Sequence, residues 1–153
     1  MTLVSANEEF VEFSLSAQEH QVIRKVLELY PLVPPAHQTV SREMSQTTEY
    51  QQLLDHALAE QRQANKEHLQ RWLSKAGAFQ RIPAGWRFVL KREDAEWLLQ
   101  VINDVRIGSW LALGSPENTL DPGELEPKQL RLWVAMQVCG MLQMAVLQAL
   151  GFS

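Results

Sequence analysis

The sequence has a single cysteine, Cys139, and only seven glycines and seven prolines in 153 residues. One cysteine excludes a disulfide framework, and the modest glycine and proline content excludes a collagen-like chain or a flexible linker. The sequence also has no large excess of charge of one sign, because it contains 14 basic and 18 acidic residues. A chain that is 46% hydrophobic and 21% charged does not have the composition of a disordered protein. We therefore expect one globular domain over residues 1–153 with a sizeable core.

Targeting signals are lacking as well. The first residues, MTLVSANEEF, do not show the basic and then apolar pattern of a secretory signal, so we expect a protein of the reducing cytoplasm. No residue from Leu132 to Ser153 is charged, and this stretch is long enough to span a bilayer. It contains Gln137, Gln143 and Gln148, whose side-chain amides are unfavourable in hydrocarbon. We therefore expect a buried helix and no membrane anchor.

The motifs of common enzyme classes are missing too. The sequence has no phosphate-binding glycine-rich loop, no dinucleotide-binding fingerprint and no nucleophile elbow. His56 and Glu60 have the spacing of two ligands on one helix face, but no third metal ligand is identifiable. Cys139 lies among apolar residues, as is typical of a small buried side chain. We expect no metal and no cofactor, and nothing here favours an enzyme.

The apolar periodicity predicts a mainly α fold of the α+β class, with four principal helices and a small two-stranded sheet. Residues 8–15 and 86–90 are the two predicted strands, and we expect them to pair with each other. Ser16 and Glu19 have the spacing of a capping box at the start of the first helix. An ordered surface connection is predicted over residues 31–46. The helices are predicted over residues 16–30, 48–76, 93–113 and 127–150.

The predicted helix over residues 48–76 is polar almost all round in its middle. Such a segment is solvated or faces polar groups from other helices. A continuous helix and a helix broken near Asn65 are both compatible with this pattern. Gly77 is the predicted stop.

The predicted helix over residues 93–113 is apolar nearly all round, yet it carries Asn103, Asp104 and Arg106. At 100° per residue, Asp104 and Arg106 point in nearly opposite directions and cannot neutralise each other. If they are buried, each needs its own partner, because an unpaired buried charge is very costly. The candidate partners are Glu60 or Glu67 for Arg106, and Arg131, or Arg62 and Lys66, for Asp104.

Two interpretations of this polar group remain open. One is a buried network that fixes the register of the helices. The other is a ligand pocket formed by Trp97, Asn103, Asp104 and Arg106, in which Arg106 anchors an anion with help from Asn103. Gly108 costs about 1 kcal/mol of helix stability relative to alanine. Its presence therefore predicts the close crossing of another helix.

The run from Trp97 to Leu111, WLLQVINDVRIGSWL, resembles the signature of a bacterial family catalogued as domain of unknown function 2017. That signature has a tryptophan, a leucine, Asn-Asp-x-Arg-hydrophobic and a nearby glycine. The order of the predicted elements is compatible with the family over most of the chain. Two features depart from it: Ser109-Trp110 after Gly108, and a last helix rich in glutamine and methionine. The resemblance implies the fold but no established activity. Because family members are often encoded beside an adaptor of the Clp protease, it also implies a role near protein turnover.

Positive charge is concentrated in residues 61–92, which hold eight basic residues and one acidic residue, with aromatic residues between them. This pattern calls for a check of nucleic-acid binding. Arg62 and Lys66 share a helix face that Arg71 and Lys75 do not, so the helix forms no single basic stripe. Nucleic-acid binding through residues 61–92 therefore stays an alternative that we do not favour. We expect Arg62, Lys66, Arg87 and Lys91 to form a surface for a protein partner.

The last predicted helix leaves little polar surface and belongs either at the centre of a bundle or at a subunit contact. A central helix of a monomer and a homodimer through this C-terminal helix both remain open. The function that we favour is a non-enzymatic cytoplasmic interaction or adaptor protein with an unidentified protein partner. The alternative from another class is an anion sensor or an enzyme with a pocket around Arg106.

Overall fold

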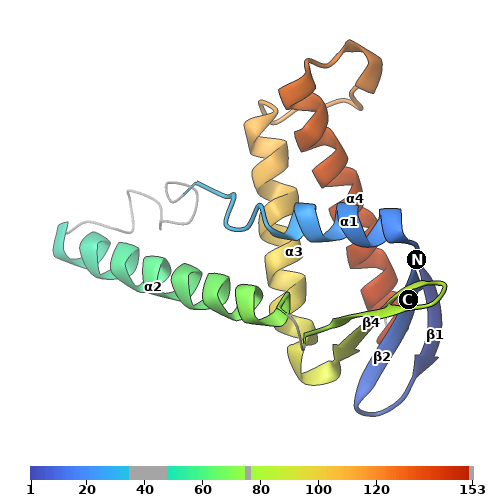
Figure 1. Cartoon of the computed structure of the whole chain (residues 1–153). Helices are drawn as coiled ribbons and strands as arrows, with labels where there is room; N and C mark the ends of the chain where they lie inside the picture. Colours follow the sequence, from blue (N-terminus) through green and yellow to red (C-terminus); the bar gives the residue numbers. More distant parts are fainter. Residues whose placement is uncertain (35–47, 75–76, 152–153) are drawn as a thin grey trace.

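The computed structural model describes residues 1–34, 48–74 and 77–151, and these form an α+β fold with the four predicted helices (Figure 1). Most of the predicted connection over residues 31–46 lies outside the described residues. The elements in chain order are β1 (Thr2–Ala6), β2 (Phe10–Leu15), α1 (Ala17–Leu27), α2 (Thr48–Trp72), β3 (Phe79–Ile82), β4 (Gly85–Lys91), α3 (Arg92–Ala112), a short 3-10 helix η2 (Pro122–Glu124) and α4 (Pro127–Ala149).

The sheet has four antiparallel strands in the order β1-β2-β4-β3, so the prediction of two strands was wrong. The predicted pairing of the two central strands is confirmed, with Phe13 opposite Phe88. The two missed strands are the edges. β1 is exposed along its whole length and therefore shows no alternation of buried and exposed side chains. β3 has only four residues and lies between Gly77 and Pro83, where turn residues dominate the pattern.

The core lies between the inner face of the sheet and the helices. Val11, Phe13 and Leu15 of β2 are buried, which is the face that the alternation predicts. The rings of Trp72 and Phe88 meet edge to face at 5.7 Å between centroids, which joins the end of α2 to the sheet.

The start of α1 has the predicted capping box. The Glu19 backbone N–H donates to Ser16 Oγ at 3.0 Å, and the Ser16 N–H donates to Glu19 Oε1 at 2.9 Å. α3 and α4 lie side by side, and α1 crosses both of them (Figure 1). The contact between α3 and α4 buries apolar side chains such as Val105 and Leu142.

α2 is one continuous helix through Asn65 and ends at Trp72, before the predicted end at residue 76. It points away from the rest of the molecule (Figure 1). Leu69 and Trp72 at its C-terminal end are buried, as is Leu73 directly after it, whereas Leu53 near its N-terminal end is 70% exposed. The polar middle of α2 is largely solvated, as its composition predicts.

Candidate functional site

Asp104 on α3 binds the chain segment that follows α1, which comprises residues 28–34. Its Oδ1 accepts hydrogen bonds from the backbone N–H groups of Leu32 at 2.6 Å and Val33 at 3.3 Å. The predicted ion pairs of Asp104 with Arg131, or with Arg62 and Lys66, are therefore wrong. A carboxylate that accepts from backbone N–H groups forms charge-assisted bonds, and these satisfy the charge without a basic side chain.

Arg62 binds the same short segment from the side of α2. Its Nη2 donates to the Val33 carbonyl oxygen at 2.6 Å. Asn65, one turn further along α2, donates to the buried Tyr30 hydroxyl at 3.2 Å. Burial raises the pKa of Tyr30, so this phenol stays protonated at neutral pH. The segment after α1 thus connects α2 with α3.

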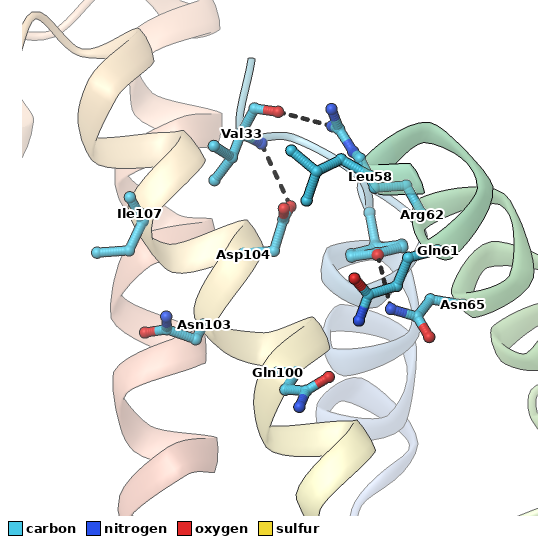
Figure 2. A pocket seen from close by; sticks show the side chains of 10 residues that line it. Val33, Leu58, Gln61, Arg62, Asn65, Gln100, Asn103, Asp104 and Ile107 are labelled. Carbon is cyan, nitrogen blue, oxygen red and sulfur yellow. Dashed lines mark hydrogen bonds between the residues drawn. The ribbon is translucent and has the colours of Figure 1, made fainter. Parts of the chain in front are cut away.

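A cleft of about 290 Å³ lies between α2 and α3, next to these bonds. Figure 2 shows Gln100 and Asp104 on the side of α3 that faces α2, and Gln61 and Asn65 on the side of α2 that faces α3. Its volume is at the lower end of the range for ligand pockets, and its lining is more polar than is usual for them. Its lining residues are Tyr30, Val33, Leu58, Gln61, Arg62, Asn65, Gln100, Asn103, Asp104 and Ile107.

Gly108 lies where the segment after α1 passes over α3. A Cβ atom at this position would lie 2.7 Å from the Leu32 carbonyl carbon and the Leu32 Cβ. The predicted close approach exists, but the partner is a chain segment without regular secondary structure and not a helix. Asp104 and Gly108 are one turn apart and serve the same contact, one through hydrogen bonds and the other through its small size.

Arg106 is not among the residues that line this cleft. Its Nη2 donates to Asn103 Oδ1 at 3.1 Å, and no carboxylate pairs with it within the described part of the chain. The predicted pairing with Glu60 or Glu67 is therefore wrong.

Burial raises the pKa of the Cys139 thiol on α4 to about 12, although the charge of Arg106 acts in the opposite direction. Cys139 is fully buried and protonated, as expected of a structural side chain.

Trp97 lies in the N-terminal part of α3 and does not line the cleft. Its ring stacks on His68 of α2 with 3.9 Å between the centroids, and it meets Trp72 edge to face. His68 Nε2 also lies 3.9 Å from Asp94 Oδ1. The structure thus separates the four predicted site residues. Asp104 and Asn103 line the cleft, Arg106 does not line it but donates to Asn103, and Trp97 joins α3 to α2.

The four predicted basic partner residues also have different surroundings. Arg87 donates to Glu12 across the sheet at 2.6 Å, and Arg62 donates to the Val33 carbonyl. Lys66 is exposed on α2, and Lys91 is exposed at the end of β4. Two of the four cations are therefore occupied by bonds within the protein. The idea that these residues form one partner surface stays a prediction.

His56 and Glu60 on α2, which have the spacing of two metal ligands, make a contact between side chains on the surface. His56 Nε2 lies 2.9 Å from Glu60 Oε1, and both side chains are exposed. Among the described residues no group of three His, Cys, Asp or Glu side chains is placed to hold a metal ion.

α4 carries a row of exposed side chains on the face opposite α3. The row repeats at intervals of four, three, four, three and four residues, which is the spacing of one face of a helix. We call it the α4 stripe; it consists of Leu130, Val134, Gln137, Met141, Met144 and Gln148, all of which are exposed. On the opposite side Ala135, Cys139, Leu142 and Val146 are buried.

Sequence reasoning treated this helix as apolar all round and did not divide it into two faces. It also did not single out Leu130. The spacing was visible in the sequence, but the buried and the exposed faces are similarly apolar, so composition does not tell them apart. By length and composition α4 is also the one described helix that could cross a membrane.

Comparison of the chain with protein-family models, with curated proteins and with solved structures finds no match in any of the three. The resemblance of the Trp97–Leu111 run to a family of unknown function thus stays a prediction.

Proposed function

We propose that this protein is a non-enzymatic interaction protein that binds another protein through the α4 stripe. The observation that carries the proposal is the exposure of large apolar side chains along one helix face. Met144 is 63% exposed and Met141 is 47% exposed, and Leu130 and Val134 are each 37% exposed. Exposed large apolar side chains gathered on one face mark interaction surfaces. Methionine adds a flexible, polarizable side chain that adapts to different partners.

The other candidate sites favour a structural role and thus support the same proposal. Asp104 and Arg62 use hydrogen-bonding groups on the segment after α1, and Arg87 uses its guanidinium on Glu12. Cys139 has a raised pKa and is buried, which is the opposite of an activated nucleophile. A cytoplasmic location forms part of the proposal. A role near protein turnover follows only from the family resemblance and forms part of the proposal.

The test is photo-crosslinking in the native cell, with a photoreactive amino acid at position 144 or at position 53. Met144 and Leu53 are matched, because both are exposed apolar residues on helix surfaces, at 63% and 70%. We expect defined protein adducts from position 144 and none of comparable yield from position 53. Equal yields from the two positions, or no adduct from position 144, would contradict the proposal.

A further inference from the structure

We propose that the protein covering the α4 stripe is a second copy of this chain, with the two α4 helices antiparallel about a two-fold axis near residue 139. This inference rests on the proposed function, because it names the partner of the same face. Three properties of the stripe lead to it: its spacing, the distribution of charge along α4 and the size of the surface.

The spacing of the stripe fits an antiparallel pair. Intervals of four and three residues keep a row of side chains facing a neighbouring helix, as in a coiled coil. In a two-fold contact, residue i of one copy meets residue j of the other, and j meets i. One register places every member of the stripe opposite another member. In that register Leu130 faces Gln148, Val134 faces Met144 and Gln137 faces Met141. A shift by seven residues would leave members at both ends of the stripe without a counterpart.

The charges of α4 favour this direction. Lys128 and Arg131 are exposed near its N-terminal end, and no charged residue follows them in the helix. The last turn has no basic residue, so the partial negative charge at this end of the helix has no basic neighbour within α4. Antiparallel packing brings Arg131 of one copy beside the last turn of the other. Parallel packing would instead place the two basic ends together. The stripe itself is uncharged and offers nothing to a strongly charged partner.

The size of the surface predicts a weak, reversible dimer. A helix of 23 residues is about 34 Å long and about 10 Å wide, so its face covers roughly half of the ~800 Å² that each partner buries in a standard interface. We therefore expect dissociation constants in the micromolar range. A lipid bilayer fits this face less well, because Gln137 and Gln148 lie within the stripe. The opposite face of α4 is packed against the rest of the protein, with Cys139 and Val146 fully buried.

Sedimentation equilibrium from low micromolar to several hundred micromolar protein tests the inference. We expect the wild type to change from monomer to dimer across this range. Val134→Lys and Met144→Glu should each remain monomeric, because each places an unpaired charge at the contact. An equimolar mixture of the two variants should dimerise again, because residues 134 and 144 face each other and the new charges attract. Leu53→Glu on α2 is the matched control and should dimerise as the wild type does. Circular dichroism of each variant checks that it is folded.

Four results would overturn the inference. They are a wild type that stays monomeric at every concentration, single variants that still dimerise, a mixture that stays monomeric, and loss of dimer in Leu53→Glu. Flotation with phosphatidylcholine–phosphatidylglycerol vesicles provides a separate outcome. Monomeric wild type that floats with vesicles, when Met144→Glu does not, would assign the stripe to lipid and overturn the inference. Monomeric protein that still crosslinks to a different protein from position 144 would overturn this inference and leave the proposed function intact.

Discussion

α2 and α4 have nearly the same length, 25 and 23 residues, but the rest of the protein holds them in different ways. α4 is uncharged after Arg131 and buries side chains from Ala135 to Val146. α2 carries charged residues along its length, and among its described side chains, residues 49–72, only Leu69 and Trp72 at the C-terminal end are buried. Two helices of similar length therefore differ in how much of their surface packs against the rest of the protein. α4 packs through apolar side chains and still exposes apolar side chains on its other face. α2 packs through apolar side chains at its C-terminal end and forms hydrogen bonds to the segment after α1.

The strongest way to break this comparison is to shorten one leucine in each helix. Leu142 on α4 is 2% exposed, and Leu58 on α2 is half-buried beside the cleft. We expect Leu142→Ala to lower the free energy of unfolding by about 2–5 kcal/mol, as is usual for buried leucines. Leu58→Ala should lower it by less than about 1 kcal/mol. Urea denaturation followed by circular dichroism measures both, and equal losses would contradict the described difference in packing.

The second prediction concerns the polar attachment of α2. Asp104→Ala leaves the N–H groups of Leu32 and Val33 without their acceptor, which should cost about 1–3 kcal/mol of stability. Asp104→Asn keeps one oxygen at this position and should cost less. Because Arg62 binds the same segment, hydrogen exchange should accelerate more in α2 than in α4. If exchange accelerates equally in both helices, the segment after α1 does not hold α2.

Both the successes and the failures of sequence reasoning have physical causes. Four helices and the capping box at Ser16 followed from periodicity and spacing, which are local properties. The pairing of β2 with β4 followed from the low stability of an unpaired strand, because only these two strands were predicted. β1 was not predicted, because an exposed edge strand has no buried face and so shows no alternation of apolar and polar residues. The partners of Asp104 could not be predicted, because they are backbone N–H groups, which every residue except proline has. Gly108 correctly indicated a close approach, but nothing local distinguishes a helix from an irregular segment as the partner.

The smallest expected effect concerns His20 on α1, whose ring packs on the sheet. His20 is buried, its ring stacks on Trp86 at 3.7 Å between centroids, and burial lowers its pKa, with Arg24 acting in the same direction. The folded protein therefore keeps His20 neutral at a pH where the unfolded chain binds a proton. Stability should be complete above about pH 6.5 and should fall as the pH drops from there toward the lower pKa of the folded state. The decrease from this group cannot exceed about 1.4 kcal/mol per pH unit.

His20→Phe is the matched variant for this effect, because it keeps an aromatic ring between Trp86 and Phe79. Urea denaturation of both proteins between pH 5 and pH 8, in steps, isolates the contribution of the imidazole. We expect the variant to lose less stability than the wild type below about pH 6.5. Parallel curves for the two proteins would show that His20 does not titrate differently on folding.

The central claim is that the exposed face of α4 is a contact surface for a second copy of the chain. The most direct measurement is the mass of the wild-type protein and of Met144→Glu by sedimentation equilibrium over increasing concentration. The account predicts that the wild-type mass rises toward twice that of the chain and that the Met144→Glu mass stays at one chain. A wild type that remains a monomer throughout, or a Met144→Glu variant that dimerises equally well, would contradict it.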